Sequence, residues 1–255
     1  MGHGRWNCFF GKGGGIVTSK IYLGTILGTD GYYYKGVFEL FLSKAGESVT
    51  YGGDIRALIM DDNYVYVGGD TTKKVYKLNK SDLSKAGESV TYGGNIYALA
   101  QDANYVYVGG YTTQKVYKLN KSDLSKAGES VNYGGNILAL TQDNNYVYVG
   151  GVTTQKVYKL NKSDLSKAGE SVDYGGSIYA LTQDDNYVYV GGATTQKVYK
   201  LNKSDLSKAA ESVDYGGTIY ALAQDDNYVY VGGYTTKKVY GLATYYELVG
   251  YRRVE

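Results

Sequence analysis

The chain has 255 residues and a formal net charge of only +2, from 27 basic and 25 acidic side chains that are interspersed. It has no basic stripe that would neutralise phosphates, so nucleic acid is not an expected partner. No apolar run approaches the roughly 20 residues that a membrane-spanning helix needs, which argues against membrane insertion. The composition, with 32 tyrosines, 36 glycines and no proline, favours half-buried β-sheet surfaces built with tyrosine.

Residues 1–17 are a glycine-rich N-terminal arm without the apolar core of a signal peptide. Export by the general secretory route is therefore not expected, although a virion component released by lysis would need no signal. We favour an extracellular surface or a virion over the cytoplasm, while the compartment itself stays open. The single histidine and the single cysteine, His3 and Cys8, both lie in this arm.

The rest of the chain offers little material for catalysis. Without histidine or cysteine, neither a Ser/His/Asp triad nor a His/Cys metal site can be assembled there. The sequence therefore predicts a protein that is not an enzyme, with no catalytic residue, metal ligand or cofactor. Paired carboxylates such as Asp184 and Asp185 leave a carboxylate-dependent hydrolase as a minor alternative. We interpret them as turn residues that bond their own backbone.

Most of the chain is one unit repeated every 41 residues. The glycine pair that follows YVYV begins at Gly68, Gly109, Gly150, Gly191 and Gly232. A period of this length indicates a solenoid, an array or a propeller. Alternating apolar residues between turn residues predict four strands in each repeat. In one copy these are strand A (Ile96 to Gln101), strand B (Tyr105 to Val108), strand C (Lys115 to Leu119) and strand D (Lys126 to Tyr133).

An eroded first copy precedes the regular ones. Asp30 to Gly36 matches Asp226 to Gly232, and Val37 to Leu40 matches Val239 to Leu242. We predict that this copy contributes strands A, B and C but lacks the B to C loop, because Gly36 directly precedes Val37.

Together with one C-terminal strand near Tyr245 to Gly250, the count reaches about 24 strands. The fold class predicted is all-β: a single β-propeller over residues 18–255 with six four-stranded blades. Five blades plus an N-terminal arm are the alternative. Arg5 to Phe10, pairing with the last blade, is a second candidate for the strand that closes the ring.

The segments YVYVGG, KVYKLNKSD, SKAGESV and IYALxQDDN resemble the YVTN-type repeats of archaeal surface-layer proteins. They are also similar to the related pyrroloquinoline-quinone-like repeats. The resemblance spans residues 18 to about 243 and implies a propeller without a particular activity, because such blades occur in surface-layer, scaffold, binding and enzyme proteins. The proline that often precedes strand A in the YVTN form is missing, and no quinone-site residue is present, so no cofactor is implied.

Several positions are predicted to build the fold. The strand-B tyrosines should form the core between blades, and the strand-A alanines should lie where the ring is tightest. Lysines of strand C and acidic residues of strand D are expected on solvated faces. Gly87, Gly128 and Gly169 become Ala210 in the last copy, so that position should not need a positive φ.

The copies differ mainly in two loops, B to C and D to A, which in a four-stranded blade emerge at the same end of the ring. The differing positions include Arg56, Tyr97, Leu138, Tyr179 and Tyr220 early in strand A. The residues predicted to bind a ligand are Asp70, Asn95, Tyr111, Asn136, Ser177, Thr218 and Tyr234. Tyrosines would stack, and the amide and hydroxyl groups would form hydrogen bonds. Neutral drift after duplication explains the same differences without function.

The leading hypothesis is a non-enzymatic, multivalent binding or scaffold propeller. Its loop face would recognise a repetitive surface glycan or polymer, or a protein partner, with ring symmetry turning weak sites into avidity. The alternative is a structural building block of a virion or surface layer that packs against identical copies or a carrier protein. Oligomeric state and ligand identity remain open at this point.

Overall fold

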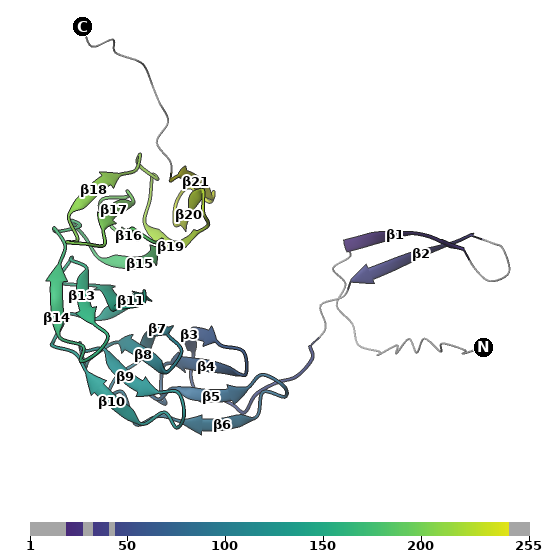
Figure 1. Ribbon diagram of the computed structural model, residues 1–255, viewed down its shortest axis with the longest axis horizontal. Helices are drawn as coiled ribbons and strands as arrows, with labels where there is room; N and C mark the ends of the chain where they lie inside the picture. The colour runs from purple at the N-terminus through teal and green to yellow at the C-terminus, as the bar shows by residue number, and fades with distance from the viewer. Residues whose placement is uncertain (1–18, 28–32, 41–43, 245–255) are drawn as a thin grey trace, which may run out of the picture. The chain divides into compact units, whose positions relative to one another are not determined.

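The computed structural model describes residues 19–27, 33–40 and 44–244 (Figure 1). The chain divides into two compact units, Met1–Glu47 and Ser48–Glu255. Every regular element in the described ranges is a strand, so the all-β prediction is confirmed there. None of the described residues forms a helix that could span a membrane. His3, Cys8, the arm at residues 1–17 and the C-terminal strand near Tyr245 lie outside the described residues.

The first unit contains an antiparallel pair, β1 (Ser19–Leu27) and β2 (Tyr33–Leu40). The register shifts between Leu23 and Ile26. The prediction of separate B and C strands on either side of Gly36 is wrong, because β2 runs through Gly36 and Val37 without a break. No residues stand between them to reverse the chain direction.

The second unit holds five antiparallel sheets, each formed by strands in chain order. The first is β3 (Ile55–Met60), β4 (Tyr64–Gly69), β5 (Tyr76–Asn79) and β6 (Lys85–Glu88). The second is β7 (Ile96–Gln101), β8 (Tyr105–Gly110), β9 (Tyr117–Asn120) and β10 (Lys126–Glu129). The third is β11 (Ile137–Gln142), β12 (Tyr146–Gly151), β13 (Tyr158–Asn161) and β14 (Lys167–Glu170). The fourth is β15 (Ile178–Gln183), β16 (Tyr187–Gly192), β17 (Tyr199–Asn202) and β18 (Lys208–Glu211). The fifth has three described strands, β19 (Ile219–Gln224), β20 (Tyr228–Gly233) and β21 (Tyr240–Ala243).

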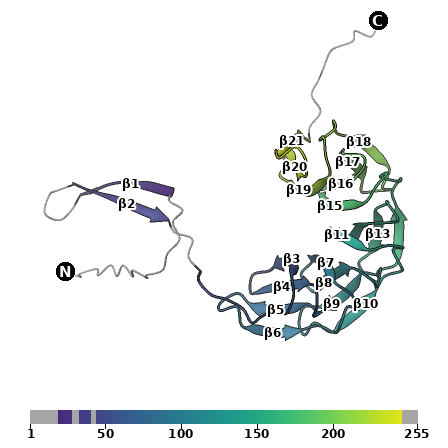
Figure 2. The same cartoon turned by 180° about the vertical axis from the view of Figure 1, so that it is seen from behind.

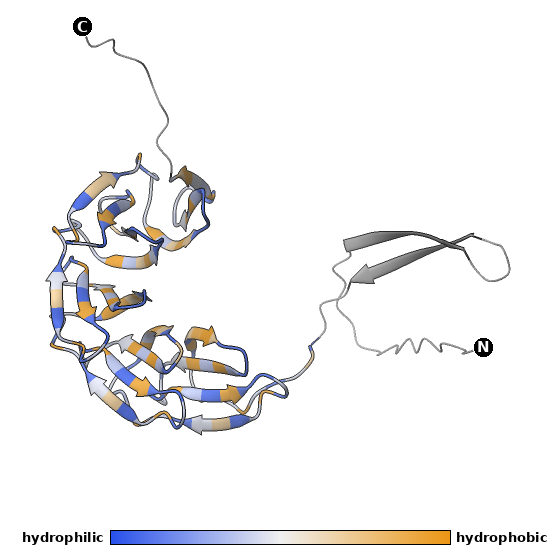
Figure 3. Ribbon diagram, viewed as in Figure 1, coloured by the Kyte–Doolittle hydropathy of each residue, from blue (hydrophilic) through white to orange (hydrophobic). Residues whose placement is uncertain are grey.

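Within the second unit the sheets follow one another around an arc (Figures 1 and 2). Strands β3, β7, β11, β15 and β19 lie on the inside, where each contacts the next. Strands β6, β10, β14 and β18 lie on the outside. Hydrophobic and hydrophilic residues are interspersed along the strands (Figure 3). The strand-A alanines line the inside of this arc as predicted.

The predicted bounds of three strands need correction. Strand C, predicted as Lys115 to Leu119, begins at Tyr117 and ends at Asn120. Strand B includes its glycine pair, because Gly109 pairs with Ala98 and Gly110 with Ile96 in the ladder. Strand D ends at Glu129 and not at Tyr133, since the chain then leaves the sheet. The hydroxyl of Ser130 accepts a hydrogen bond from the Val116 N–H at 2.9 Å, which marks the point where it leaves.

The core repeats between neighbouring sheets. Tyr107 and Val116 of the second sheet are buried against Ile137, Val147 and Leu160 of the third. A Cβ on Gly109 would stand closer than 3.0 Å to Cγ2 of Ile137, so glycine is needed for the sheets to approach. Full burial of one such isoleucine contributes about 1.5–3 kcal/mol. The prediction that strand-B tyrosines form the core between sheets is confirmed for Tyr66, Tyr107, Tyr148 and Tyr189. It does not hold for Tyr230 in the fifth sheet, which is 38% exposed among the described residues.

The strand-C lysines correct another prediction. Lys118 is only 7% exposed, and the equivalent Lys77 and Lys159 are buried to the same degree. The Lys118 ammonium donates to the carbonyl oxygens of Lys162 at 2.6 Å and Ser163 at 3.2 Å, both in the next sheet. It also lies 4.0 Å from the ring centroid of Tyr105. These lysines tie sheets together and are not part of a solvated face.

The C to D turn carries an unusual backbone conformation at a leucine. Leu124 has a φ of 59° and is buried in the interface with the preceding sheet. A non-glycine residue in the left-handed region is strained by about 1–2 kcal/mol, and the apolar packing of the leucine offsets that strain. By contrast, Gly128 has no positive φ, and a Cβ there would meet nothing within 4 Å. The prediction that this position does not need a positive φ is confirmed.

Candidate functional site

The B to C and D to A loops lie side by side in every sheet. The N–H of Tyr111 donates to the Asn95 carbonyl at 2.8 Å, and the N–H of Tyr234 donates to the Thr218 carbonyl at 2.8 Å. The same backbone bond joins Asp70 to Asp54, Val152 to Asn136, and Ala193 to Ser177. We call these paired loops the loop rim. All seven sequence-predicted ligand residues lie on it.

Each B to C loop has a strained turn. At Thr112 the φ is 77°, and the N–H of Thr113 donates to the Tyr111 carbonyl at 3.0 Å, which makes a γ-turn with a positive central φ. A second left-handed residue, Gln114, follows with a φ of 56°. Such conformations are strained by on the order of 1–3 kcal/mol each and persist only where the surroundings hold them. Here the Thr113 hydroxyl donates to the Tyr92 carbonyl at 3.0 Å. The loop is therefore held in one shape.

Two predicted stacking residues are accessible. The side chains of Tyr111 and Tyr234 are 50% and 72% exposed, unlike the buried tyrosines of strand B. Tyr111 makes an edge contact with Tyr97, with ring centroids 6.0 Å apart. The hydrogen-bonding residues Asn95, Asn136, Ser177 and Thr218 are half-buried on the same rim. Asn136 also reaches across sheets, since its side-chain oxygen accepts from the Thr112 N–H at 3.5 Å.

In the first sheet, Arg56 and Asp70 occupy the positions that Tyr97 and Tyr111 occupy in the second, and they form an ion pair. The Arg56 guanidinium donates to Asp54 and Asp70 at 2.9 Å each, and its Nε adds a bond to Asp70 at 3.2 Å. Hydrogen bonding to Asp70 raises the pKa of Arg56. Arg56 also lies 5.9 Å from the ring centroid of Tyr97 in the next sheet. Asp70 was predicted as a ligand residue, but here its carboxylate is already engaged by Arg56.

The early strand-A positions converge on a cavity. Arg56, Tyr97, Leu138, Tyr179 and Tyr220 line a space of about 320 Å³ on the inner side of the arc, together with the alanines that follow them. Tyr179 and Tyr220 contact each other with ring centroids 5.1 Å apart. The sequence showed that these positions vary, but it did not predict them as ligand residues. Their variation between copies is the only sequence signal for them, since their convergence on one cavity depends on the fold.

The opposite end of each sheet holds the predicted turn carboxylates. The Asp102 side chain accepts from the N–H groups of Asn104 and Tyr105 at 2.9 and 2.8 Å, and from the Tyr107 hydroxyl at 2.7 Å. The prediction that the aspartate at this position of the A to B turn bonds its own backbone is confirmed. In the first sheet, burial alone would raise the pKa of Asp61. Hydrogen bonds from the Tyr64 N–H and the Lys121 ammonium outweigh burial and lower the pKa to about 2.

Within the ranges whose side chains are described, no group of three or more histidine, cysteine, aspartate or glutamate side chains is arranged to hold a metal ion.

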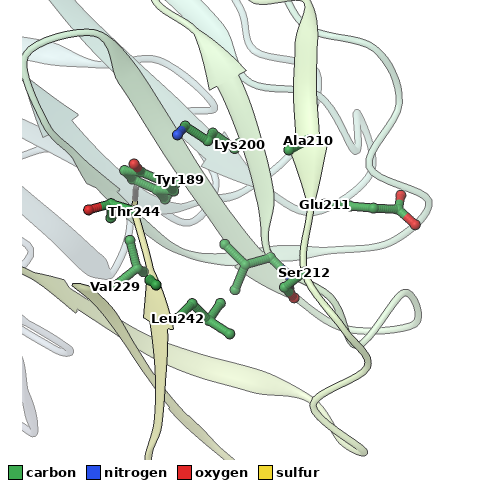
Figure 4. A pocket seen from close by; sticks show the side chains of 10 residues that line it. Tyr189, Lys200, Ala210, Glu211, Ser212, Val229, Leu242 and Thr244 are labelled. Atoms are coloured by element: carbon green, nitrogen blue, oxygen red, sulfur yellow. The ribbon is translucent and has the colours of Figure 1, made fainter. Parts of the chain in front are cut away.

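A second cavity, of about 110 Å³, lies between the fourth and fifth sheets (Figure 4). Tyr189, Val198 and Leu242 are among its lining residues. In the three preceding interfaces the equivalent residues pack against a buried leucine from the C to D turn, namely Leu124, Leu165 and Leu206. The corresponding part of the fifth sheet lies outside the described residues. This cavity lies where that leucine packs in the three preceding interfaces.

Solved structures share this arrangement of sheets. One is the WD40 beta propeller domain of Doa1, with a TM-score of 0.61 and 15% identity over 71% of this chain and 62% of that one. The chain is a β-propeller repeat protein. Its described sheets are five blades of the propeller, the last with three described strands.

Two further propeller-like neighbours have higher TM-scores. The computationally designed Ika8 protein has a TM-score of 0.69 and 17% identity, covering 77% of this chain and 60% of that one. A chain of the Mitotic Checkpoint Complex has a TM-score of 0.68 and 13% identity, covering 75% of this chain and 64% of that one. This chain thus spans about 60–64% of the length of these structures. At such identities the likeness shows the fold alone.

The sequence matches no family model and no curated protein. The narrower resemblance to YVTN-type repeats therefore stays a prediction.

Proposed function

We propose that this propeller is a non-enzymatic binding or scaffold module that engages its partner through the loop rim. The observation that carries the proposal is the matched variation on that rim. Arg56 and Asp70 are charged in the same copy and bond each other, while Tyr97 and Tyr111 contact each other in the next. Independent drift does not favour complementary changes at two positions 14 residues apart. Selection for a defined surface in each copy explains them.

The ligand class we propose is a repetitive glycan or polymer. The exposed rings of Tyr111 and Tyr234 offer apolar faces with a polar tip, which suits the mixed faces of a sugar ring. Asn95, Asn136, Ser177 and Thr218 add donors and acceptors beside them. Because the rim repeats in each blade, weak contacts with a repetitive partner would combine into avidity. A relationship to YVTN-type surface-layer repeats, which the sequence suggests, fits a partner at an extracellular surface or in a virion.

The test is a glycan array probed with the wild-type chain and with the double variant Tyr111→Ala/Tyr234→Ala. We expect binding to a repetitive sugar that weakens at least tenfold in the double variant, which corresponds to about 1.4 kcal/mol. The matched control is Asn104→Ala, an exposed residue in the A to B turn. Absence of binding to every glycan, or equal loss in both variants, would contradict the glycan proposal.

A structural building block is the second candidate, and the same exposed tyrosines support it, because they would also pack against identical copies or a carrier protein. One structural neighbour is a chain of the Mitotic Checkpoint Complex, which agrees with a protein partner for a fold of this kind. Electron microscopy of the purified chain at rising concentration separates the two candidates. Ordered assemblies that the double tyrosine variant abolishes would favour the building block, and a monomer at all concentrations would count against self-assembly.

A further inference from the structure

The first sheet of the second unit exposes a face that each later sheet packs against its neighbour. We call it the leading face and define it by Ile55, Leu58 and Leu83. Ile55 is 54% exposed and Leu58 is 59% exposed. The isoleucines equivalent to Ile55 are fully buried against the preceding sheet; they are Ile96, Ile137, Ile178 and Ile219. The leading face is therefore one half of a sheet-to-sheet interface that is complete at four other places in the same unit.

The fifth sheet exposes the complementary half. We call it the trailing face and define it by Tyr230, Gly232 and Val239. Tyr230 is 38% exposed and Val239 is 73% exposed. The equivalent side chains of the four earlier sheets are buried; they are Tyr66, Tyr107, Tyr148, Tyr189, Val75, Val116, Val157 and Val198. A Cβ on Gly232 would meet nothing within 4 Å, while one on the equivalent glycine of each earlier sheet would stand closer than 3.0 Å to an isoleucine of the next sheet. The trailing face thus has an open place where each complete interface holds an isoleucine.

The two faces do not meet within the described part of one chain. Strands β3 and β20 lie toward opposite ends of the arc of sheets (Figures 1 and 2), and both Ile55 and Gly232 are open. We propose that the leading face of one copy docks on the trailing face of a second copy, with Ile55 over Gly232. This contact repeats between chains the interface that the unit forms four times internally. It joins two different faces, so copies associate head to tail.

Charges on the two faces agree with this pairing. In three of the four complete interfaces, an aspartate of the A to B turn forms an ion pair with a lysine of the next sheet. The pairs are Asp61 with Lys121 at 3.1 Å, Asp102 with Lys162 at 3.2 Å and Asp143 with Lys203 at 3.5 Å. The equivalent aspartate of the fifth sheet is Asp225, and the equivalent lysine of the first sheet is Lys80. Both are exposed, and docking would bring these opposite charges together.

The leucine of the C to D turn is a second feature of the leading face that fits a docked partner. Leu124, Leu165 and Leu206 have a φ of 59° to 60° and are buried against the preceding sheet. Leu83 has the same left-handed φ of 59° but is only half-buried. The first sheet therefore has the strain without the full packing that offsets it elsewhere. A docked second copy would supply the missing contacts.

One contact of the complete interfaces is missing from the trailing face. Gly241 occupies the position of Lys77, Lys118 and Lys159, whose ammonium groups donate to carbonyl oxygens of the next sheet. The contact between copies lacks these hydrogen bonds, so we expect it to be weaker than the internal interfaces. Association should therefore be reversible and depend on concentration.

Sedimentation velocity of the full-length chain over a range of concentrations tests the proposal. Ile55→Asp and Val239→Asp each place a charge in one face, and both positions are exposed in the single chain, so folding should be unaffected. Each variant alone should associate about tenfold more weakly or less, because docking would bury an unpaired charge. Val90→Asp is the matched control, since Val90 is 51% exposed beside a complete interface and belongs to neither face.

A mixture of the two variants gives the sharpest outcome. The Ile55→Asp copy keeps an intact trailing face, and the Val239→Asp copy keeps an intact leading face. Their equimolar mixture should form dimers and nothing larger, at a concentration where each variant alone is monomeric. A wild-type chain that stays monomeric at every concentration, or a mixture that does not associate, would overturn the proposal. Equal weakening by Val90→Asp would do the same.

Cross-linking distinguishes docking of two copies from coverage of either face by the chain itself. In a Cys8→Ser background, the single variants Ile55→Cys and Gly232→Cys are mixed, treated with a short bismaleimide and analysed by mass. The expected product contains one copy of each. No cross-link in the mixture refutes the proposal, and so does a chain carrying both substitutions that cross-links only within a monomer. The proposal does not rest on the loop rim: Tyr111→Ala/Tyr234→Ala should leave the cross-link unchanged, so its outcome is independent of glycan binding.

Discussion

The buried lysine between blades gives the sharpest prediction, and Lys118→Met is the perturbation. The Lys118 ammonium bonds to two carbonyl oxygens of the next blade at 2.6 and 3.2 Å and lies over the Tyr105 ring. A hydrogen bond from a charged group contributes about 1.5–3 kcal/mol, and a carbonyl left without a partner costs about 1–3 kcal/mol. Methionine keeps most of the side-chain packing, and the ammonium no longer loses hydration. We expect a net loss of about 2–3 kcal/mol.

Urea unfolding of the full chain, followed by fluorescence and circular dichroism, measures this loss. Lys115→Met is the control, because Lys115 belongs to the same short segment but forms an exposed ion pair with Glu129, worth about 0.2–1 kcal/mol. Burial also lowers the pKa of Lys159, the equivalent lysine of the third sheet, which agrees with a desolvated ammonium. Equal effects of the two substitutions would refute the reasoning that Lys118 joins neighbouring blades.

Three further predictions concern single positions. Gly109→Ala should cost about 1–3 kcal/mol because its methyl would press on the next sheet, whereas Gly128→Ala, with open space around it, should change the urea midpoint little. Thr112→Gly should stabilise the chain by about 1 kcal/mol, because glycine accepts the positive φ of 77°; a lower thermal midpoint would contradict this. The folded pKa of Asp61, about 2, lies below the unfolded value of about 3.9. Its contribution to stability is therefore present above about pH 4 and lost as pH falls toward 2. Unfolding free energies between pH 5 and 2 should show this slope and lose part of it in Asp61→Asn, and identical slopes would exclude the carboxylate.

The elements that depend on local sequence could be predicted. Strand A at Ile96–Gln101 was predicted with its observed bounds, because alternation and the flanking turn residues define it locally. The Asp102 turn followed from the tendency of aspartate to bond its own backbone. The strand-B tyrosines, such as Tyr107, were predicted as core because blades bury both faces. Local sequence together with the repeat period was enough to predict these three features.

The residues that depend on a neighbouring blade could not be predicted in the same way. Lys118 is buried because two carbonyl oxygens, 44 and 45 residues later in sequence, point at its ammonium. The segment KVYKL contains no feature that predicts these two carbonyl acceptors, and a lysine in a short strand is ordinarily solvated. The contact of Arg56 with Asp70 likewise depends on two loops that only the fold brings together. β2 differs from the prediction because matching to the regular copies assigned two strands to a segment that lacks the B to C loop, and without that loop Gly36 and Val37 continue one strand.

The contrast between residues at the blade interfaces and residues at the loop rim also explains where the copies are free to differ. A residue such as Ile137 is constrained by its own blade and by Gly109 of the preceding one, so a change at one position requires a change in another copy. Two pairs at the loop rim and the adjoining start of strand A form within a single blade, Arg56 with Asp70 and Tyr97 with Tyr111. Pairs on the rim can therefore change together inside one copy while the interfaces stay constant. A propeller built this way keeps one method of joining its blades and can present a different chemical pair at each, which is the property that a binding surface requires.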